Sequence, residues 1–293
     1  MNRVSVGKEP ELSIILPSKN EAAALARLLP DLRRKHPEAE ILVIDDGSTD
    51  DTIGICAAAS VRVVSHRYSM GNGAAIKTGA RLASGEVLIF MDADGQHRPE
   101  DVAVLLDGLA NGFDMVVGAR EPHAHASMGR RIANGIYNRI ASWMVGHKVE
   151  DLTSGFRAVW ADKFRHFIHL LPNGFSYPTT ITMAFFRAGH SLSYVTVPVQ
   201  PRTGKSHLAP LKDGVRFLLI IFRVGTLYSP LKLFFPVSLT FFATGIVYYL
   251  VTYLTDGRFT NMGVLLFITS VLVFLIGLVS EQITTLLYAS SRD

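Results

Sequence analysis

Two carboxylates one residue apart, Asp92 and Asp94, directly follow the apolar run 87–91. Such a pair alone is common in solvated turns, but here a strand-like run leads into it and Gly95-Gln96 follows. Mg²⁺ and Mn²⁺ take oxygen ligands, and Mg²⁺ is usually held by one or two carboxylates together with substrate phosphates. We therefore expect Asp92 and Asp94, with Gln96 as a further oxygen donor, to hold Mg²⁺ or Mn²⁺ on a nucleotide diphosphate.

Further acidic side chains follow other apolar runs. Asp45 and Asp46 come directly after residues 41–44, and Glu21 lies a few residues beyond 12–16. In a parallel sheet, ligands bind beyond the carboxyl ends of the strands. The convergence of these carboxylates predicts one site at that edge, and it is stronger evidence than any single motif.

A glycine pair precedes a helical stretch. Gly71-x-Gly73 resembles a dinucleotide fingerprint, but Ile76 stands where the third glycine belongs, and the first strand of a βαβ unit does not precede it. The sequence therefore argues against NAD. We expect the glycines to permit a tight turn, with Lys77 near the phosphates.

Two other residue pairs are weak signals. His123 and His125 lack the spacing of further zinc ligands, which favours solvent-facing histidines. Ser18 and Ser48 have no nucleophile elbow and no evident histidine partner, so a hydrolase triad is not supported.

The elements that must position these residues alternate between strands and helices. Helical spacing of apolar residues separates short apolar runs, as at Leu25, Leu28 and Leu32. This alternation predicts an α/β domain with a mostly parallel sheet covered by helices on both faces. The expected strands are 12–16, 41–44, 61–64, 87–91 and 113–117, and the expected helices are 20–35, 49–59, 74–83 and 99–109.

Two stretches near the C-terminal end, 233–255 and 259–280, contain no charged residue. Each exceeds the roughly 20 residues that cross a bilayer core. They concentrate the chain's hydrophobic content, 48%, and we expect transmembrane helices at about 233–255 and 261–284. Gly245 or Gly277 could permit close helix contacts, so we also expect a homo-oligomer through these helices.

The charge distribution predicts an orientation. The net charge is +4, and the stretch before the first span holds one acidic residue, Asp213, against six basic ones: Arg202, Lys205, Lys212, Arg216, Arg223 and Lys232. The positive-inside rule then puts the N-terminal domain in the cytoplasm, at the inner membrane of a bacterial cell. The basic cluster suits anionic membrane lipid better than nucleic acid, which we do not expect as a partner. Cys56 is the only cysteine, which fits a reducing compartment.

Three segments are expected along the chain. Residues 1–205 would form the cytoplasmic catalytic domain, 206–232 an amphipathic interfacial segment and 233–293 the membrane helices. Within the first, 130–145 is a second candidate interfacial helix, with an ordinary surface helix as the alternative. Its apolar side would combine Ile132, Ile136 and Ile140 with Trp143 or Met144.

Three motifs resemble family 2 glycosyltransferases of the GT-A (Rossmann-like) fold: 16–21 (LPSKNE), 43–50 (VIDDGSTD) and 91–96 (MDADGQ). The stretches 151–157 (DLTSGFR) and 202–206 (RTGKS) narrow the resemblance to polyprenyl-phosphate glycosyltransferases. That group includes dolichol-phosphate mannose synthases and bacterial undecaprenyl-phosphate sugar transferases, and two C-terminal spans also occur in it. The resemblance covers about residues 11 to 232.

The resemblance implies roles for individual residues. The nucleoside pocket would be lined by Pro17, Glu21 and Asp46, with Asp46 near the base. The phosphates of donor and acceptor would be surrounded by Arg120, Arg131, Arg202 and Ser206. Asp151 matches an acid that either orients the sugar or assists the acceptor. Two positions depart from the pattern, since relatives often have an aromatic residue at Lys19 and a lysine at His207.

The implied reaction is an inverting, metal-dependent transfer of a sugar from GDP-mannose or a UDP-hexose to undecaprenyl or dolichyl phosphate at the cytoplasmic membrane face. The residues expected to carry it are Asp94, Asp151, Arg131 and Arg202. One alternative is transfer to another membrane lipid such as diacylglycerol, whose hydroxyl would need a base. Another is a non-catalytic nucleotide-sugar-binding partner of a lipid flippase. A processive polysaccharide synthase would need more spans, and a transporter would need an ionisable residue at the centre of a span.

Overall fold

The computed structural model describes residues 11–120, 128–174, 177–198, 222, 225–258 and 260–289, with residues 128–134, 256 and 289 described by their backbone. The expected site residues Arg202 and Ser206 lie outside these residues, as do His123 and His125, for which the sequence favoured solvent-facing side chains. The chain divides into two compact units, Met1–His207 and Leu208–Asp293.

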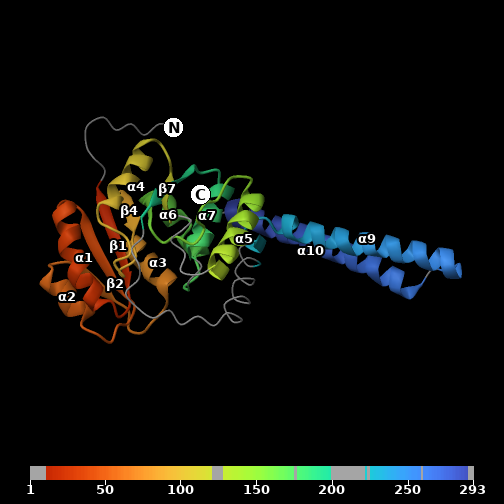
Figure 1. Ribbon diagram of the computed structural model, residues 1–293, viewed down its shortest axis with the longest axis horizontal. Coiled ribbons are helices and arrows are strands. Elements are labelled where there is room, and N and C mark those ends of the chain that lie inside the picture. The colour runs from red at the N-terminus through yellow and green to blue at the C-terminus, as the bar shows by residue number, and fades with distance from the viewer. Residues whose placement is uncertain are drawn as a thin grey trace. The chain divides into compact units, whose positions relative to one another are not determined.

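Within the described residues, seven strands form one sheet in the order β3-β2-β1-β4-β6-β5-β7. Figure 1 labels β1, β2, β4 and β7 of this sheet. Every neighbouring pair is parallel except those of β6, which is antiparallel to both β4 and β5. The mostly parallel sheet expected from the sequence is therefore confirmed. The strands are β1 Leu12–Ser18, β2 Glu40–Asp45, β3 Arg62–Ser65, β4 Val87–Phe90, β5 Met115–Arg120, β6 Arg157–Trp160 and β7 Leu192–Val197.

Helices cover both faces of this sheet, so its central strands are buried on both sides and read as continuous apolar runs. Ile14 and Leu16 face one layer, where they meet the leucines of α1 and α4. Ile15 faces the other layer, where Gly79 of α3 comes so close that an added Cβ would lie 2.4 Å from the Ile15 side chain. The helices are α1 Ala22–Lys35, α2 Thr52–Ala58, α3 Asn72–Leu82, α4 Asp101–Ala110, α5 Met128–Val145, α6 Ala161–His166, η1 Ile168–Leu170 and α7 Tyr177–Arg187.

Helix α2 begins at Thr52, later than the start of the expected helix 49–59. The carboxylate of Asp50 explains the shift, because its Oδ1 accepts hydrogen bonds from the backbone N–H of Thr52 at 3.2 Å and from its hydroxyl at 2.6 Å. Asp50 thus accepts hydrogen bonds from the first residue of α2 although it lies outside the helix.

Helix α5 packs through a different side from the one that its isoleucines suggest. Tyr137, Ala141 and Met144 are buried, whereas Ile136 and Trp143 are each 54% exposed. The expected apolar side is therefore split, with Met144 in the core and Trp143 outside. An exposed apolar strip remains on α5.

The second unit contains two long apolar helices, α9 Pro230–Asp256 and α10 Asn261–Ala289. Their segments Pro230–Thr255 and Asn261–Tyr288 are long and apolar enough to cross a membrane. The hydroxyls of Ser238 and Ser270 each donate to the other's carbonyl oxygen at 2.9 Å, which fixes the register of the helices.

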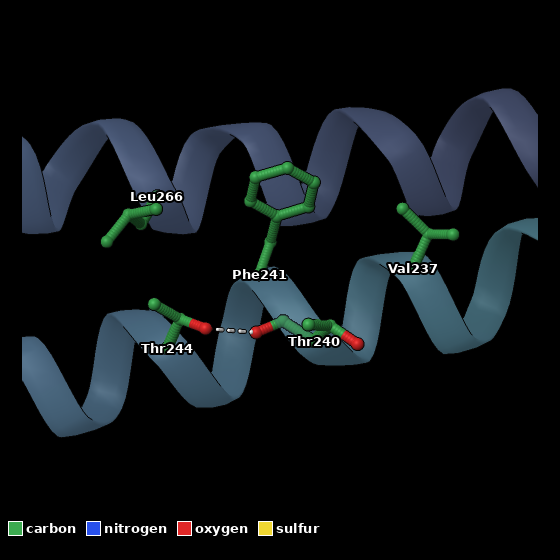
Figure 2. A pocket seen from close by; sticks show the side chains of 5 residues that line it. All are labelled: Val237, Thr240, Phe241, Thr244 and Leu266. Carbon is green, nitrogen blue, oxygen red and sulfur yellow. Dashed lines mark hydrogen bonds between the residues drawn. The ribbon is translucent and has the colours of Figure 1, made fainter.

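Both glycines expected to permit close helix contacts do so within this hairpin. A Cβ added at Gly245 would lie 3.0 Å from Phe267, and one at Gly277 would lie 2.7 Å from Phe234. The homo-oligomer stays a prediction, and these glycines serve packing inside one chain. Figure 2 shows a shallow pocket on the hairpin, lined by Val237, Thr240, Phe241, Thr244 and Leu266.

Candidate active site

The polar residues expected to share a site lie at one edge of the sheet. Strands β1, β2, β4 and β5 end there, and β6 begins there because it runs in the opposite direction. This reversal brings the segment before Arg157, which carries Asp151, to the same edge as Arg120 at the end of β5. The sequence did not reveal the antiparallel strand that causes this convergence.

Asp46, expected near the nucleoside base, holds the loop 66–71. It is 4% exposed, and its Oδ1 lies 2.8 Å from His66 Nδ1 and accepts from the Met70 N–H at 2.7 Å. Its Oδ2 accepts from the Ser69 hydroxyl at 2.7 Å and from the Gly71 N–H at 2.9 Å. Burial raises the pKa of Asp46, but these hydrogen bonds outweigh it and leave the pKa below its usual value.

The loops that follow β1 and β2 are tied together. The side chain of Asn20, at a φ of 57°, accepts from the Thr49 N–H at 2.7 Å, and the Asn20 N–H donates to the Ser48 hydroxyl at 2.9 Å. The first residue of α1, Ala22, donates its N–H to Asp50 Oδ2 at 3.0 Å. The two loops therefore form one rigid unit.

Pro17 and Glu21 bracket the β1 side of this unit, with Pro17 near the end of β1 and Glu21 directly before α1. Lys19, between them, donates to the Ser69 hydroxyl at 2.8 Å. It thereby joins the β1 loop to the loop that Asp46 holds.

Asp92 and Asp94 follow β4 in a half-buried turn. Asp94 Oδ1 accepts from the Gln96 N–H at 3.1 Å, and Gly95 between them has a φ of 74°. No group of three or more His, Cys, Asp or Glu side chains within the described part of the chain could hold a metal ion alone. The donor set fits a cation shared with a substrate, because two carboxylates and an amide oxygen from one turn leave coordination positions for phosphates and water.

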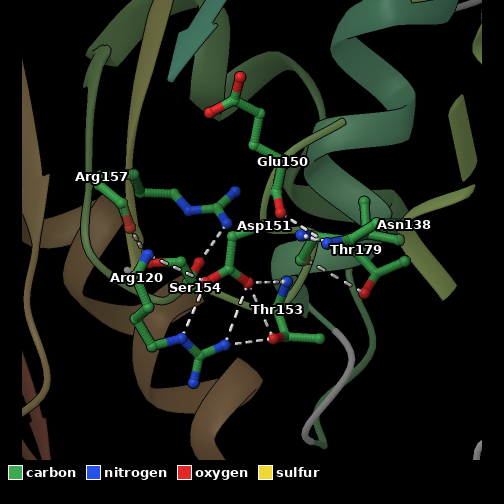
Figure 3. Close-up of polar contacts among 10 residues, drawn as sticks. Arg120, Asn138, Glu150, Asp151, Thr153, Ser154, Arg157 and Thr179 are labelled. Atoms are coloured by element: carbon green, nitrogen blue, oxygen red, sulfur yellow. Dashed lines mark hydrogen bonds and ion pairs between the residues drawn. The ribbon is translucent and has the colours of Figure 1, made fainter. Parts of the chain in front are cut away.

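Asp151 and Arg120 form a bidentate ion pair (Figure 3). Arg120 Nε donates to Oδ2 at 2.8 Å and Nη2 to Oδ1 at 3.0 Å, and the Thr153 N–H donates to Oδ1 at 3.0 Å. Burial raises the pKa of Asp151, but Arg120 outweighs it and keeps the pKa below its usual value. Asp151 is therefore a fully engaged, ionised carboxylate.

Lys77, which stays a predicted phosphate neighbour, ties α3 to the loop 171–174. Its Nζ donates to the Leu171 carbonyl at 3.1 Å and also to the side chain of Asn173. The Ala74 N–H at the start of α3 donates to the Asn173 carbonyl at 3.0 Å. A Cβ at Gly73 would lie 2.1 Å from the Pro172 carbonyl oxygen, so the glycine permits this close approach.

Sequence reasoning missed three side chains behind this edge. Arg157 and Tyr177 are fully buried there, and Arg157 stood within the quoted stretch 151–157. His97 stacks on Phe156 with ring centroids 4.5 Å apart, and burial lowers the pKa of His97 to about 4. A neutral histidine next to the Asp92–Gln96 turn adds no positive charge to it.

Some expected residues are not placed in the site. The backbone of Arg131 lies in α5, but its side chain is not described. Of the expected interfacial segment 206–232, the described residues are 222 and 225–232.

Comparisons with known proteins agree with this architecture. The model of the family "Glycosyl transferase family 2" matches residues 13–167, and that of the "GtrB C-terminal hairpin" matches residues 229–286. The chain is similar to glycosyltransferase AglJ of Haloferax volcanii, with 30% identity over 240 residues, which is 80% of this chain and 78% of the relative.

Other relatives carry more specific names. Undecaprenyl-phosphate mannosyltransferase of Micrococcus luteus is 31% identical over 213 residues, covering 67% of this chain and 86% of the relative. Dolichyl-phosphate hexose transferase of Haloferax volcanii is 28% identical over 207 residues, covering 70% of this chain and 89% of the relative.

Solved structures share the fold. Glucosyl-3-phosphoglycerate synthase from Mycobacterium tuberculosis, in complex with Mn²⁺, UDP and glucosyl-3-phosphoglycerate, aligns with a TM-score of 0.60 and 22% identity. The alignment covers 74% of this chain and 79% of that one. At this identity the similarity concerns the GT-A fold.

Proposed function

The chain belongs to glycosyl transferase family 2, and on that premise we propose that it transfers a sugar from a nucleotide-sugar to a polyprenyl phosphate at the cytoplasmic face of a membrane. The donor would be GDP-mannose or a UDP-hexose, and the acceptor undecaprenyl or dolichyl phosphate. The names of the mannosyltransferase and hexose transferase relatives support this choice of acceptor.

The divalent cation would be held by Asp92, Asp94 and Gln96. When bound, Mg²⁺ or Mn²⁺ would neutralise charge that develops on the departing diphosphate. The complex of the solved relative contains Mn²⁺ and UDP, which supports a cation of this kind. Pro17 and Glu21 would line the nucleoside pocket, and Asp46 would support it through the loop 66–71.

The observation that carries the proposal is the ion pair of Asp151 with Arg120. A polyprenyl phosphate has a second pKa of about 6 and is largely dianionic at neutral pH, so it needs no base. One of its oxygens would form a bond to the anomeric carbon while the bond from that carbon to the diphosphate breaks. The nucleoside diphosphate would leave, and in-line attack would invert the anomeric centre.

A hydroxyl acceptor such as diacylglycerol would release a proton and require a base. Asp151 is poorly suited to that role, because its oxygens already accept from Arg120 and Thr153 and its pKa is lowered. The arrangement favours a phosphate acceptor. Arg120, Arg131, Arg202 and Ser206 would then contact the phosphates, since the arginine fork pairs with phosphate oxygens.

Two helices long and apolar enough to cross a membrane support a lipid substrate. Helices α9 and α10 would anchor the chain in the bilayer, and the exposed Ile136 and Trp143 of α5 suit contact with its interface. We propose 1–205 as the catalytic domain, 206–232 as an interfacial segment and 233–293 as the membrane part.

The test is sugar transfer by the purified full-length chain in detergent with Mn²⁺ or Mg²⁺. A panel of labelled GDP- and UDP-sugars is offered with undecaprenyl phosphate, dolichyl phosphate or diacylglycerol. A metal-dependent glycolipid formed on a polyprenyl phosphate, and lost with Asp94→Ala, is the expected result. Transfer to diacylglycerol or to water alone would overturn the proposed acceptor.

A further inference from the structure

Arg157 is the most unusual buried group in the catalytic unit. Its side chain is 0% exposed at the first position of β6. Within the described part of the chain no carboxylate lies within ion-pair distance of it, and its Nε has no hydrogen-bond acceptor. Burial of a charged group without a direct counter-ion is costly, so the position calls for a physical reason.

The guanidinium joins two segments that are distant in sequence. Its Nη2 donates to the Ser154 carbonyl (Figure 3), and its Nη1 donates to the Pro178 carbonyl and the Thr182 hydroxyl, each at 3.3 Å. Ser154 belongs to the loop that carries Asp151, and the other two acceptors lie in α7. Arg157 therefore fastens that loop to the first turns of α7.

Tyr177, the first residue of α7, completes the attachment. Its ring centroid lies 5.8 Å from the guanidinium carbon of Arg157, and its hydroxyl donates to the Gly155 carbonyl at 3.3 Å. Two buried side chains thus donate hydrogen bonds to consecutive carbonyls of the loop: Arg157 to that of Ser154 and Tyr177 to that of Gly155.

The fastened loop touches a proposed metal ligand. A Cβ built on Gly155 would lie 3.1 Å from Asp92 Oδ2 and 3.3 Å from Oδ1. The carboxylate of Asp92 therefore lies against the backbone of Gly155, and a side chain at this position would require Asp92 to shift by a few tenths of an ångström. Any displacement of the loop would move the surface that supports Asp92.

The charge of Arg157 also reaches the site. Burial lowers its pKa, while Tyr177, Tyr194, Asp151 and Asp92 act in the opposite direction. An arginine stays protonated in proteins, so a permanent positive charge lies behind both Asp92 and Asp151. An apolar residue would avoid the desolvation cost but would supply neither this charge nor the forked donors.

We propose that Arg157 and Tyr177 form a clamp that positions the loop 151–155, and through Gly155 the Asp92 carboxylate, for binding of the divalent cation. The inference rests on the proposed function for the identity of the cation site. Arg157 is a positioning residue, because it acts through Gly155 and Ser154 and not on the substrate.

The test measures Mn²⁺ binding directly, with purified full-length protein in detergent and UDP or GDP as the nucleotide. The free Mn²⁺ signal in electron paramagnetic resonance gives the affinity without any acceptor or turnover. Arg157→Met is expected to weaken Mn²⁺ binding by about 10- to 100-fold, as the loss of outer-shell partners does at other metal sites. Arg157→Lys keeps the charge without the fork and should fall between that variant and the wild type.

Arg165→Met is the matched control. Arg165, in α6, also donates to two backbone carbonyls, Ala80 at 2.8 Å and Ala83 at 2.6 Å. Its loss should lower the melting temperature but leave Mn²⁺ affinity within about two-fold, because those carbonyls belong to α3 and the residue after it. Equal losses of Mn²⁺ affinity in the Arg157 and Arg165 variants would show a merely structural role and overturn the clamp.

Two milder variants keep the inference testable if Arg157→Met does not fold. Tyr177→Phe removes only the bond to Gly155, and Thr182→Val only one acceptor of Arg157. Each is expected to weaken Mn²⁺ binding several-fold, and wild-type affinity in both would refute the clamp. Absence of Mn²⁺ binding by the wild type would refute it as well. Binding of Mn²⁺ with a nucleotide but no transfer to polyprenyl phosphate would instead refute the proposed function and leave the clamp standing.

Discussion

The candidate site runs along one edge of the sheet, and the carboxylates at its two ends are held by different kinds of partner. At the β1–β2 end, Asp46 and Asp50 accept hydrogen bonds from backbone N–H groups and hydroxyls, and Asp46 also contacts the ring of His66. At the β5–β6 end, Asp151 is matched by the full positive charge of Arg120, with Arg157 buried behind it. Asp92 and Asp94 lie between the two ends.

This difference suits the two parts of the proposed substrate. Many short hydrogen bonds from the backbone keep their geometry whatever the charge of the ligand, which suits a pocket for a nucleoside. Arg120 can attract an arriving phosphate while it stays paired with Asp151, because Asp151 accepts from two of its five N–H donors. We therefore expect the β1–β2 end to govern stability and the β5–β6 end to govern charge-dependent steps.

The largest effect is expected for Asp94, which lies between the two ends. Asp94→Ala should lower kcat/KM by about 10³-fold, or about 4 kcal/mol, because a metal ligand is lost from the site of charge development. Asp107→Ala, which removes an exposed carboxylate of α4, is the control and should change kcat/KM less than two-fold. Steady-state assays at saturating Mn²⁺ compare them, and equal behaviour of the two variants would contradict the proposed metal site.

At the β1–β2 end, Asp46→Ala should destabilise the catalytic unit by about 3 kcal/mol, because buried donors lose their acceptor. Thermal unfolding in detergent measures this loss. The pKa of Asp46 is lowered in the folded state. The stability that it contributes is therefore complete above the ordinary carboxyl pKa of about 3.9 and disappears as the pH falls through the folded value. The variant should lose less stability than the wild type over that acidic range, and parallel curves would argue against this role.

At the β5–β6 end, Arg120→Met should lower kcat/KM by about 10- to 100-fold. Without Arg120, only the hydrogen bonds from Thr153 oppose the effect of burial on Asp151, so the pKa of Asp151 should rise and protonation should begin at a higher pH. The acid limb of the kcat/KM profile should then move to higher pH, whereas Arg120→Lys should keep most of the wild-type profile. An unmoved acid limb in both variants would mean that Asp151 does not affect the reaction through its charge.

The smallest effect is expected for Lys77, which joins α3 to the loop 171–174. Lys77→Met removes the tie from α3 to Leu171 and Asn173 and should cost about 1 kcal/mol of stability, with kcat/KM within about three-fold of the wild type. Arg81→Met, an exposed change on the same helix, is the control. A far larger loss of kcat/KM with Lys77→Met would instead support the original expectation of a phosphate contact.

The sequence predicted the part of the fold that depends on local patterns. Strands β1 to β5 and the helices among them follow from apolar runs and helical spacing. Strands β1, β2, β4 and β5 are buried on both faces and read as continuous apolar segments, whereas β3 shows only a short run. Strand β6 has four residues and begins with Arg157, so it presents no such run. Strand β7 is only half-buried. Leu192, Tyr194 and Thr196 lie on one of its faces and alternate with the residues of the other face, so the sequence shows only a weak strand pattern there.

Side-chain partners were harder to predict than positions. The acidic residues at the strand ends could be placed at one edge, because topology alone brings them there. The partners of Asp46 and Lys77 come from the loops 66–71 and 171–174, whose paths depend on tertiary packing. Arg120 and Asp151 were predicted separately, and their pairing depends on the reversed direction of β6.

That reversal has a consequence for protein engineering. The chain leaves β5 at Arg120 and re-enters the sheet at Arg157, and the two strands are direct neighbours: Val117 pairs with Arg157, and the Gly118 N–H donates to the Phe156 carbonyl at 2.9 Å. The end of β5 and the start of β6 therefore lie next to each other at one edge of the sheet. The segment between these two strands can be exchanged between homologues as a cassette without rethreading a strand.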